Sequence, residues 1–102
     1  MSAMAHELLV GVHVVDDGLY AAYREGIAPI LAEYGGSFRH DFVVARTLKS
    51  DVAHDINRVF TLRFPDVGRK DAFFADPRYL AVRTSYFPKA VKGVSFLAAY
   101  ET

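Results

Sequence analysis

The chain has 102 residues, of which 52% are hydrophobic and 14% aromatic, and its twelve basic and twelve acidic residues give a formal net charge of zero. This length suits one domain over residues 1–102 and leaves no room for a second. The balanced charge lacks the basic excess typical of nucleic-acid-binding proteins, and the absence of cysteine excludes disulfides, thiol catalysis and a thiolate metal site.

Residues 7–15 form a valine-rich apolar run that is too short to span a bilayer, and no basic segment precedes it. We therefore expect a cytoplasmic protein without a membrane partner. The β-branched content of the run favours a strand. Its side chains alternate between one face with Leu8, Val10, Val12 and Val14 and another with Leu9, Gly11, His13 and Val15.

A helix is predicted to follow this strand, with Asp17 at its N-cap. Apolar residues recur at helical spacing as far as Tyr34. Pro29 lies inside this pattern and predicts a kink over residues 26–29, because proline removes a backbone hydrogen bond and crowds the preceding turn. The glycine pair at 35–36 is expected to end the helix.

Two further strands are predicted over residues 38–48 and 56–64, with a polar loop over residues 49–55 between them. Because the loop is short, the two strands should be antiparallel neighbours. Alternation along the first of them puts three rings on one face, those of Phe38, His40 and Phe42.

The rest of the chain predicts a second helical segment and a last strand. Asp66 can cap a helix that Asp76 and Pro77 restart, and residues 87–88 (Phe-Pro) should close the segment. The last strand is predicted over residues 93–100. The resulting β-α-β-β-α-β order predicts an α+β, ferredoxin-like (split βαβ) fold, in which helices cover one face of a four-stranded antiparallel sheet.

In a monomer, the uncovered face of such a sheet would meet water and would carry polar residues at every second position of each strand. The sequence predicts a face that is too apolar for this. The residues expected on this face are half apolar: Leu9, Gly11, Val59, Thr61, Leu97 and Ala99, with His13 and Arg63 among them. We expect a second copy of the chain to cover this face in an isologous homodimer.

Several segments together resemble one known family. They are Tyr20-Ala21-Ala22-Tyr23-Arg24, Pro29, Tyr34-Gly35-Gly36-Ser37-Phe38, Asn57-Arg58-Val59-Phe60-Thr61-Leu62-Arg63-Phe64-Pro65 and Phe73-Phe74-Ala75-Asp76-Pro77-Arg78-Tyr79. Over residues 7–100 the chain resembles the domain-of-unknown-function family numbered thirteen-thirty. The resemblance implies a ferredoxin-like fold that pairs into a dimeric α/β barrel. That superfamily includes haem-degrading and quinone-forming monooxygenases and isomerases, and the family itself offers no catalytic residue to carry over.

Two histidines are candidates for catalysis, because an imidazole titrates near neutral pH. His13 lies mid-strand among apolar residues, and the alternative is an interface histidine bonded to Thr61 or to a partner subunit. His40 could line a cleft between sheet and helices, and the alternative is a partly buried core histidine. His54 falls in the polar loop, where we expect it to be solvated, and no base is evident for Ser95.

The ligand-binding candidates are an arginine and two tyrosines. Arg58 could hold a substrate carboxylate through two hydrogen bonds, or pair with Asp41, Asp55 or a carboxylate of the partner subunit. Tyr23 and Tyr86 could each donate a hydroxyl to a ligand, although most tyrosines near the helices should be core residues with one polar end. The four histidines lack metal-ligand spacing, so we expect neither a metal site nor a cofactor.

Two functions remain open at this point. In the first, the cleft between helices and sheet binds an apolar or aromatic small molecule and could support cofactor-free proton transfer or oxygenation. In the second, the chain is a non-catalytic binding or assembly module with structural histidines. The first requires a sizeable cavity that contains a titratable group of shifted pKa. The second requires that the same space be filled by aromatic side chains, namely Phe42, Phe60, Phe64 and tyrosines.

Overall fold

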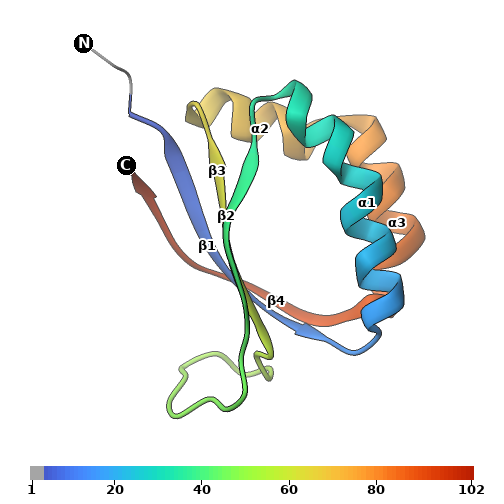
Figure 1. Cartoon of the computed structure of the whole chain (residues 1–102), viewed down its shortest axis with the longest axis vertical. Helices are drawn as coiled ribbons and strands as arrows, with labels where there is room; N and C mark the ends of the chain where they lie inside the picture. Colours follow the sequence, from blue (N-terminus) through green and yellow to red (C-terminus); the bar gives the residue numbers. More distant parts are fainter. Residues whose placement is uncertain (1–3) are drawn as a thin grey trace.

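The computed structural model describes residues 4–102 and shows a four-stranded sheet with helices on one side (Figure 1). The elements in chain order are β1 (His6–Val14), α1 (Asp17–Glu33), β2 (Ser37–Val43), β3 (Arg58–Phe64), α2 (Val67–Ala75), α3 (Pro77–Ala90) and β4 (Val91–Glu101). The strand order is β2-β3-β1-β4, and every pair of neighbours is antiparallel. This confirms the predicted fold class. Within residues 4–102, no helix is long and apolar enough to cross a membrane.

The ends of α1 follow from local hydrogen bonds. Asp16, and not Asp17 as predicted, is the N-cap, because its extended backbone lets its carboxylate accept from the backbone N–H of Leu19 at 2.9 Å. At the other end Gly35 has a φ of +71°, a left-handed conformation that favours glycine. The backbone N–H of Gly36 then donates to the carbonyl of Leu31 at 2.9 Å, which confirms the predicted stop.

A glycine allows α1 and α3 to approach closely. A Cβ atom added at Gly26 would lie 2.6 Å from Cγ1 of Val82, so the two helices pack backbone against side chain at this point. The helix α1 runs through Pro29 from Asp17 to Glu33, and the kink expected beside the proline stays a prediction.

The strands β2 and β3 are both shorter than predicted. The strand β2 ends at Val43 and not at residue 48, because its partner β3 begins only at Arg58. Before β3, Asn57 bonds to β1 through its backbone N–H, which donates to the carbonyl of Val12 at 3.0 Å, and also through its side chain. Its Oδ1 accepts from the N–H of Val14 at 2.8 Å, and its Nδ2 donates to the carbonyl of Val14 at 2.7 Å. Residues 44–57 are therefore a connection outside the sheet.

The helix α3 continues through Pro88 to Ala90, so the predicted end at residues 87–88 is wrong. Tertiary contacts outweigh the cost of the proline here. Ala90 is completely buried, and its carbonyl accepts from the N–H of Val15 at 2.8 Å. The last strand accordingly starts at Val91, two residues earlier than predicted.

Two irregularities decide which face some side chains occupy. The register of β2 against β3 shifts between Phe38 and His40, which moves His40 to the face away from the helices. A similar shift in β4 pairs Leu9 with Ala98, so Ala99 lies on the helix side and not on the uncovered face as predicted. Simple alternation cannot detect either shift, because a bulge inserts one residue and reverses every later side chain.

The core lies between the sheet and the helices. Its largest fully buried side chains are those of Phe64, Phe73, Ile27 and Val12. The predicted inward face of the first strand is confirmed, since four of its side chains are buried: Leu8, Val10, Val12 and Val14.

We expect Gly26→Ala to destabilise the chain although alanine favours helices. Overpacking against Val82 costs about 1–3 kcal/mol, whereas the gain in helix propensity is only about 1 kcal/mol. Urea denaturation should therefore give a lower free energy of unfolding for Gly26→Ala. In a Val82→Ala background the same change should be neutral or stabilising, and equal effects in both backgrounds would contradict the close approach.

Candidate functional site

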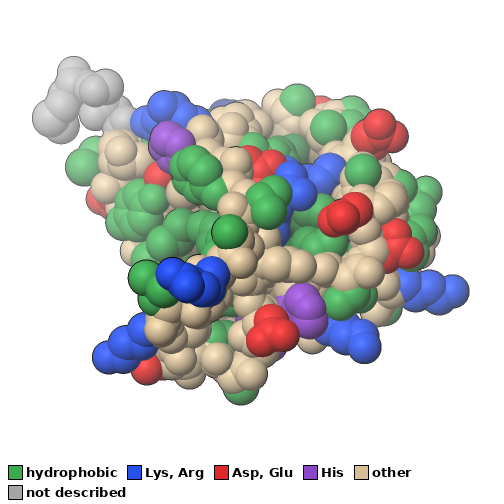
Figure 2. All heavy atoms as spheres, turned by 60° about the horizontal axis from the view of Figure 1, so that its bottom comes forward, with side chains coloured by type: hydrophobic (Ala, Val, Ile, Leu, Met, Phe, Trp, Pro, Cys, Tyr) green, Lys and Arg blue, Asp and Glu red, His purple; other side chains and the backbone are tan. Residues whose placement is uncertain are grey.

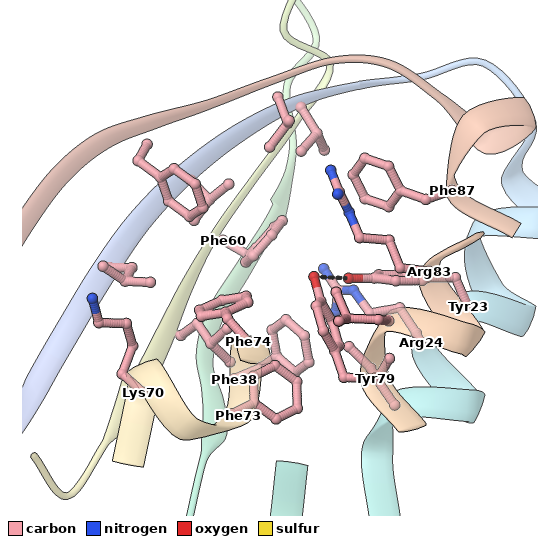
Figure 3. Close-up of a pocket in the computed structure, with 18 of the residues that line it drawn as sticks. Tyr23, Arg24, Phe38, Phe60, Lys70, Phe73, Phe74, Tyr79, Arg83 and Phe87 are labelled. Carbon is pink, nitrogen blue, oxygen red and sulfur yellow. Dashed lines mark hydrogen bonds between the residues drawn. The ribbon is translucent and has the colours of Figure 1, made fainter. Parts of the chain in front are cut away.

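A cavity of about 440 Å³ lies between the helices and the sheet (Figure 3). This volume falls within the range of about 300–1,000 Å³ that is typical of small-molecule sites. The sheet contributes apolar side chains to its lining, namely Leu8, Val10, Val12, Phe38, Phe60, Leu62, Val94 and Phe96. The helices add mostly aromatic side chains, namely Tyr20, Tyr23, Ile27, Phe73, Phe74, Tyr79, Leu80 and Phe87. Four charged residues complete the lining: Arg24, Lys70, Asp71 and Arg83.

The aromatic rings pack against one another along the walls and leave the cavity between them. Phe38 meets Phe60 edge-on at a centroid distance of 5.4 Å, and Phe73 contacts Tyr79 at 4.6 Å. Such edge and tilted contacts favour a rigid wall. Figure 3 shows the rings of Phe38, Phe60, Phe74 and Phe87 standing around the open space.

The polar centre of the lining is a pair of buried tyrosines, Tyr23 on α1 and Tyr79 on α3. Their hydroxyl oxygens lie 3.3 Å apart, drawn as the dashed line in Figure 3. Burial, together with the neighbouring Tyr79 hydroxyl, raises the pKa of Tyr23 well above its usual range. The hydroxyl of Tyr23 is therefore protonated at neutral pH. When one hydroxyl donates to the other, the second O–H is left to donate elsewhere.

Arg24, on α1, places a guanidinium at the edge of this cavity. Its central carbon lies 3.8 Å from the ring centroid of Phe38 and 4.6 Å from that of Phe60. Its Nε donates to the hydroxyl of Tyr20 at 3.0 Å, and its Nη1 donates to Asp41 at 3.3 Å. Its Nη2 is buried and has no hydrogen-bond partner among the described residues.

Asp41 is shared between two arginines. The bulge in β2 turns its carboxylate to the helix side, where Arg58 donates from Nε at 2.8 Å and from Nη2 at 2.7 Å. The hydrogen bonds from Arg58, followed by the charge of Arg24, lower the pKa of Asp41 below its usual range. One negative charge thus faces two positive ones.

The other charged residues of the lining differ in their pairing. Lys70 is paired with Asp71, with Nζ and Oδ1 2.8 Å apart. The exposed Arg83 lies over the ring of Phe87 at 4.7 Å, and no salt bridge of Arg83 occurs in the described part of the chain. The surroundings of the cavity therefore carry an excess of positive charge.

Only one of the predicted ligand-binding residues lies in this lining, Tyr23. Arg58 does not line the cavity and instead makes the ion pair with Asp41 that was the alternative interpretation. Tyr86 also lies outside the lining and packs, half-buried, against the core. A binding role for each of them stays a prediction.

The histidines lie elsewhere. His40 is exposed on the uncovered face and stacks on Phe42, with ring centroids 6.0 Å apart, so the expectation that it lines the helix–sheet cleft is wrong. His13 is half-buried on the same face opposite Gly93. The hydroxyl of Thr61, considered as its partner, accepts from the backbone N–H of His40 at 2.9 Å. Catalytic roles for His13 and His40 remain untested.

His54 is half-buried, which corrects the expectation of a solvated side chain. Its Nε2 lies 2.7 Å from the hydroxyl oxygen of Ser95, and its Nδ1 lies 2.8 Å from the carbonyl oxygen of Asp55. Ser95 thus has a histidine beside it that the sequence did not reveal. Within residues 4–102, no group of three or more histidine and acidic side chains could hold a metal ion.

Sequence reasoning missed Arg24, and it counted Tyr79 only among the five tyrosines near the helices without selecting it as a ligand-binding residue. A usable signal existed for Arg24, which follows Tyr20 by four residues and so shares its helix face. No local pattern could place Tyr79, because its contact with Tyr23 joins residues 56 positions apart.

The strand order and the helices on one face define a ferredoxin-like fold, which solved structures described as ferredoxin-like share. The family model "Domain of unknown function (DUF1330)" matches residues 8–99, so the chain belongs to this family and the resemblance is confirmed. No curated protein matches the chain significantly.

Solved structures share the fold at low sequence identity. A protein of unknown function from Rhodopseudomonas palustris is 18% identical with a TM-score of 0.78, and the match covers 98% of this chain and 83% of that one. A hydroxynitrile lyase from Passiflora edulis is 13% identical with a TM-score of 0.68, over 98% and 94% of the two chains. A dimeric protein of unknown function with a ferredoxin-like fold, from Bacteroides fragilis, is 14% identical with a TM-score of 0.60, over 96% of each chain.

We expect Asp41→Asn to lower the free energy of unfolding at pH 7 by about 1 kcal/mol, because the pair is partly exposed. The folded-state pKa of Asp41 is depressed, so its stabilisation is present above the unfolded-state pKa of about 3.9 and is lost as the pH falls further. The difference between variant and unaltered protein should therefore shrink in acid. Denaturation curves at pH 7 and pH 3 measure it, with Asp51→Asn as the control.

Proposed function

We propose that the chain binds an apolar or aromatic small molecule in the cavity between its helices and its sheet. The observation that carries the proposal is a cavity of about 440 Å³ with aromatic walls and a hydrogen-bonded pair of tyrosine hydroxyls inside it. A purely structural module would fill this space with aromatic side chains. Instead, Phe42 lies on the opposite face of the sheet, Phe60 forms part of the wall, and Phe64 packs against Phe73 in the core.

Turnover without a cofactor would depend on the Tyr23–Tyr79 pair, because no histidine among the described residues lines the cavity. The raised pKa of Tyr23 keeps its proton in place at neutral pH, which suits donation to a ligand better than abstraction from it. The lining offers no comparable feature in favour of oxygenation. The hydroxynitrile lyase among the structural neighbours supports the view that this fold can host small-molecule chemistry.

The alternative is a non-catalytic binding or assembly module. It is favoured by the engagement of two histidines in packing, since His54 bonds to Ser95 and His40 stacks on Phe42. Under this alternative the cavity stays empty of any specific ligand.

We also propose that a second copy of the chain covers the uncovered sheet face. Large apolar side chains remain exposed there: Phe42 at 58%, Leu97 at 41% and Tyr100 at 38%. Leu9 and Val59 lie half-buried beside them. Figure 2 shows hydrophobic side chains gathered on the left, the side away from the helices in Figure 1. A two-fold pairing would bury the same patch on both subunits, and the neighbour from Bacteroides fragilis is described as dimeric.

For ligand binding, we expect naphthalene-2-carboxamide, a neutral aromatic probe, to raise the melting temperature in a dose-dependent way. A concentration of about 100 times Kd should add roughly 2.7 kcal/mol to the free energy of unfolding. Val94→Trp should abolish the shift, because Val94 lines the cavity and a larger ring fills it. Val43→Trp, at an exposed position outside the lining, is the control. An undiminished shift with Val94→Trp would place binding elsewhere.

For the dimer, we expect light scattering to give twice the chain mass at micromolar concentration. Leu97→Glu should shift the protein to the monomer, since a carboxylate would be buried without a partner at the interface. Val67→Glu is the matched control, because Val67 is about as exposed, at 43%, but lies at the start of α2. A monomeric unaltered protein would refute this pairing.

A further inference from the structure

We propose that the ligand of the cavity is a carboxylic acid with an apolar, aromatic body, bound as its carboxylate by Arg24. This inference rests on the proposed binding function and adds the chemical class of the ligand. Three observations carry it: an unpartnered buried donor, a guanidinium held in place before binding, and an excess of positive charge around an apolar cavity.

The first observation is the buried Nη2 of Arg24. A guanidinium has five N–H donors and no acceptor, so it needs several acceptors once it leaves water. Tyr20 accepts from Nε and Asp41 accepts from Nη1, whereas Nη2 has no partner among the described residues. A buried donor left unsatisfied costs about 1–3 kcal/mol, and more when it is charged. Arg24 lines the cavity, and rotation of a neighbouring ring would bring Nη2, which is enclosed in this structure, within reach of an acceptor on a bound molecule.

The second observation is that Arg24 is already in position. Its guanidinium lies between the faces of Phe38, Phe60 and Tyr20, at 3.8, 4.6 and 4.9 Å from their centroids. Cation–π contacts and the bond to Tyr20 restrict the side chain, so binding an anion would cost little conformational entropy. The remaining donors then favour a planar acceptor such as a carboxylate.

The third observation is the local charge. Three cations and one anion line the cavity: Arg24, Lys70 and Arg83 against Asp71. Asp41 offsets part of this charge but is shared with Arg58. Apolar walls lower the local dielectric constant and strengthen the attraction for a ligand of opposite charge. An anion therefore fits this cavity better than a neutral molecule of the same shape.

The rest of the lining determines the body of the ligand. Apart from these charges and the tyrosine hydroxyls, the cavity presents aliphatic and aromatic side chains only. Figure 3 shows Arg24 on the helix side of the cavity together with Tyr23 and Tyr79, whose remaining O–H can donate to a second ligand oxygen. The expected ligand therefore has a polar end that binds to the helices and an aromatic body that packs between the phenylalanine rings.

The test compares two ligands of nearly equal shape, 2-naphthoate and naphthalene-2-carboxamide, by isothermal titration calorimetry at pH 7. The unaltered protein should bind naphthoate at least tenfold more tightly, since a hydrogen bond to a charged group contributes about 1.5–3 kcal/mol. Arg24→Gln should weaken naphthoate binding by about 10- to 100-fold and change carboxamide binding by no more than about threefold. Arg46→Gln, an exposed arginine outside the lining, removes the same charge and should change neither.

The outcomes separate the inference from the function on which it rests. Equal or tighter binding of the carboxamide by the unaltered protein would overturn the carboxylate assignment and leave ligand binding intact. An unchanged naphthoate affinity in Arg24→Gln would overturn the role of Arg24. If neither compound binds, the proposed function falls together with this inference. Because Arg24 also packs on Phe38 and Phe60, its variant could fail to fold, and the two-ligand comparison on the unaltered protein then decides alone.

Discussion

The arrangement of the site depends on the carboxylate of Asp41, held between Arg24 and Arg58 on the helix side of the sheet. Without this anion, two guanidinium groups would repel each other at the edge of an apolar core. With it, Arg58 makes two hydrogen bonds to β2, and the guanidinium of Arg24 lies over the rings of Phe38 and Phe60. A single β-bulge in β2 makes this possible, because it turns Asp41 inward and His40 outward.

The core and the cavity divide the space under the helices between them. Near one end, Phe64, Phe73 and Tyr79 pack ring against ring, and Phe73 and Tyr79 form the border between this dense part and the cavity. Farther along, Phe38 and Phe60 contact each other along the wall, and the space beside them remains open. Stability therefore resides mainly in the dense part of this layer. The open part loses dispersion contacts that filling would supply, a loss that is common at functional sites.

The two faces of the sheet differ in what covers them. Helices cover one face, whereas the connection between β2 and β3 reaches only part of the other. Ile56 packs so close to Gly11 that an added Cβ would lie 3.0 Å from its Cδ1. His54 lies over Gly93 in the same way and bonds to Ser95. Beyond this connection Phe42 and Leu97 stay exposed, which is the physical basis for proposing a second subunit.

The sequence by itself determined the order of the elements, the inward face of the first strand, the caps at Asp66 and Asp76 and the glycine stop at Gly35, because each depends on neighbouring residues. It also indicated the apolar second face of the sheet and singled out Tyr23, which lines the cavity. Only the tertiary structure decided the bulges, the length of α3 past Pro88 and which arginines line the cavity. These depend on partners far along the chain, such as Val15 for Ala90 at the end of α3 and Leu9 for Ala98 in β4, and local patterns carry no information about such distant contacts.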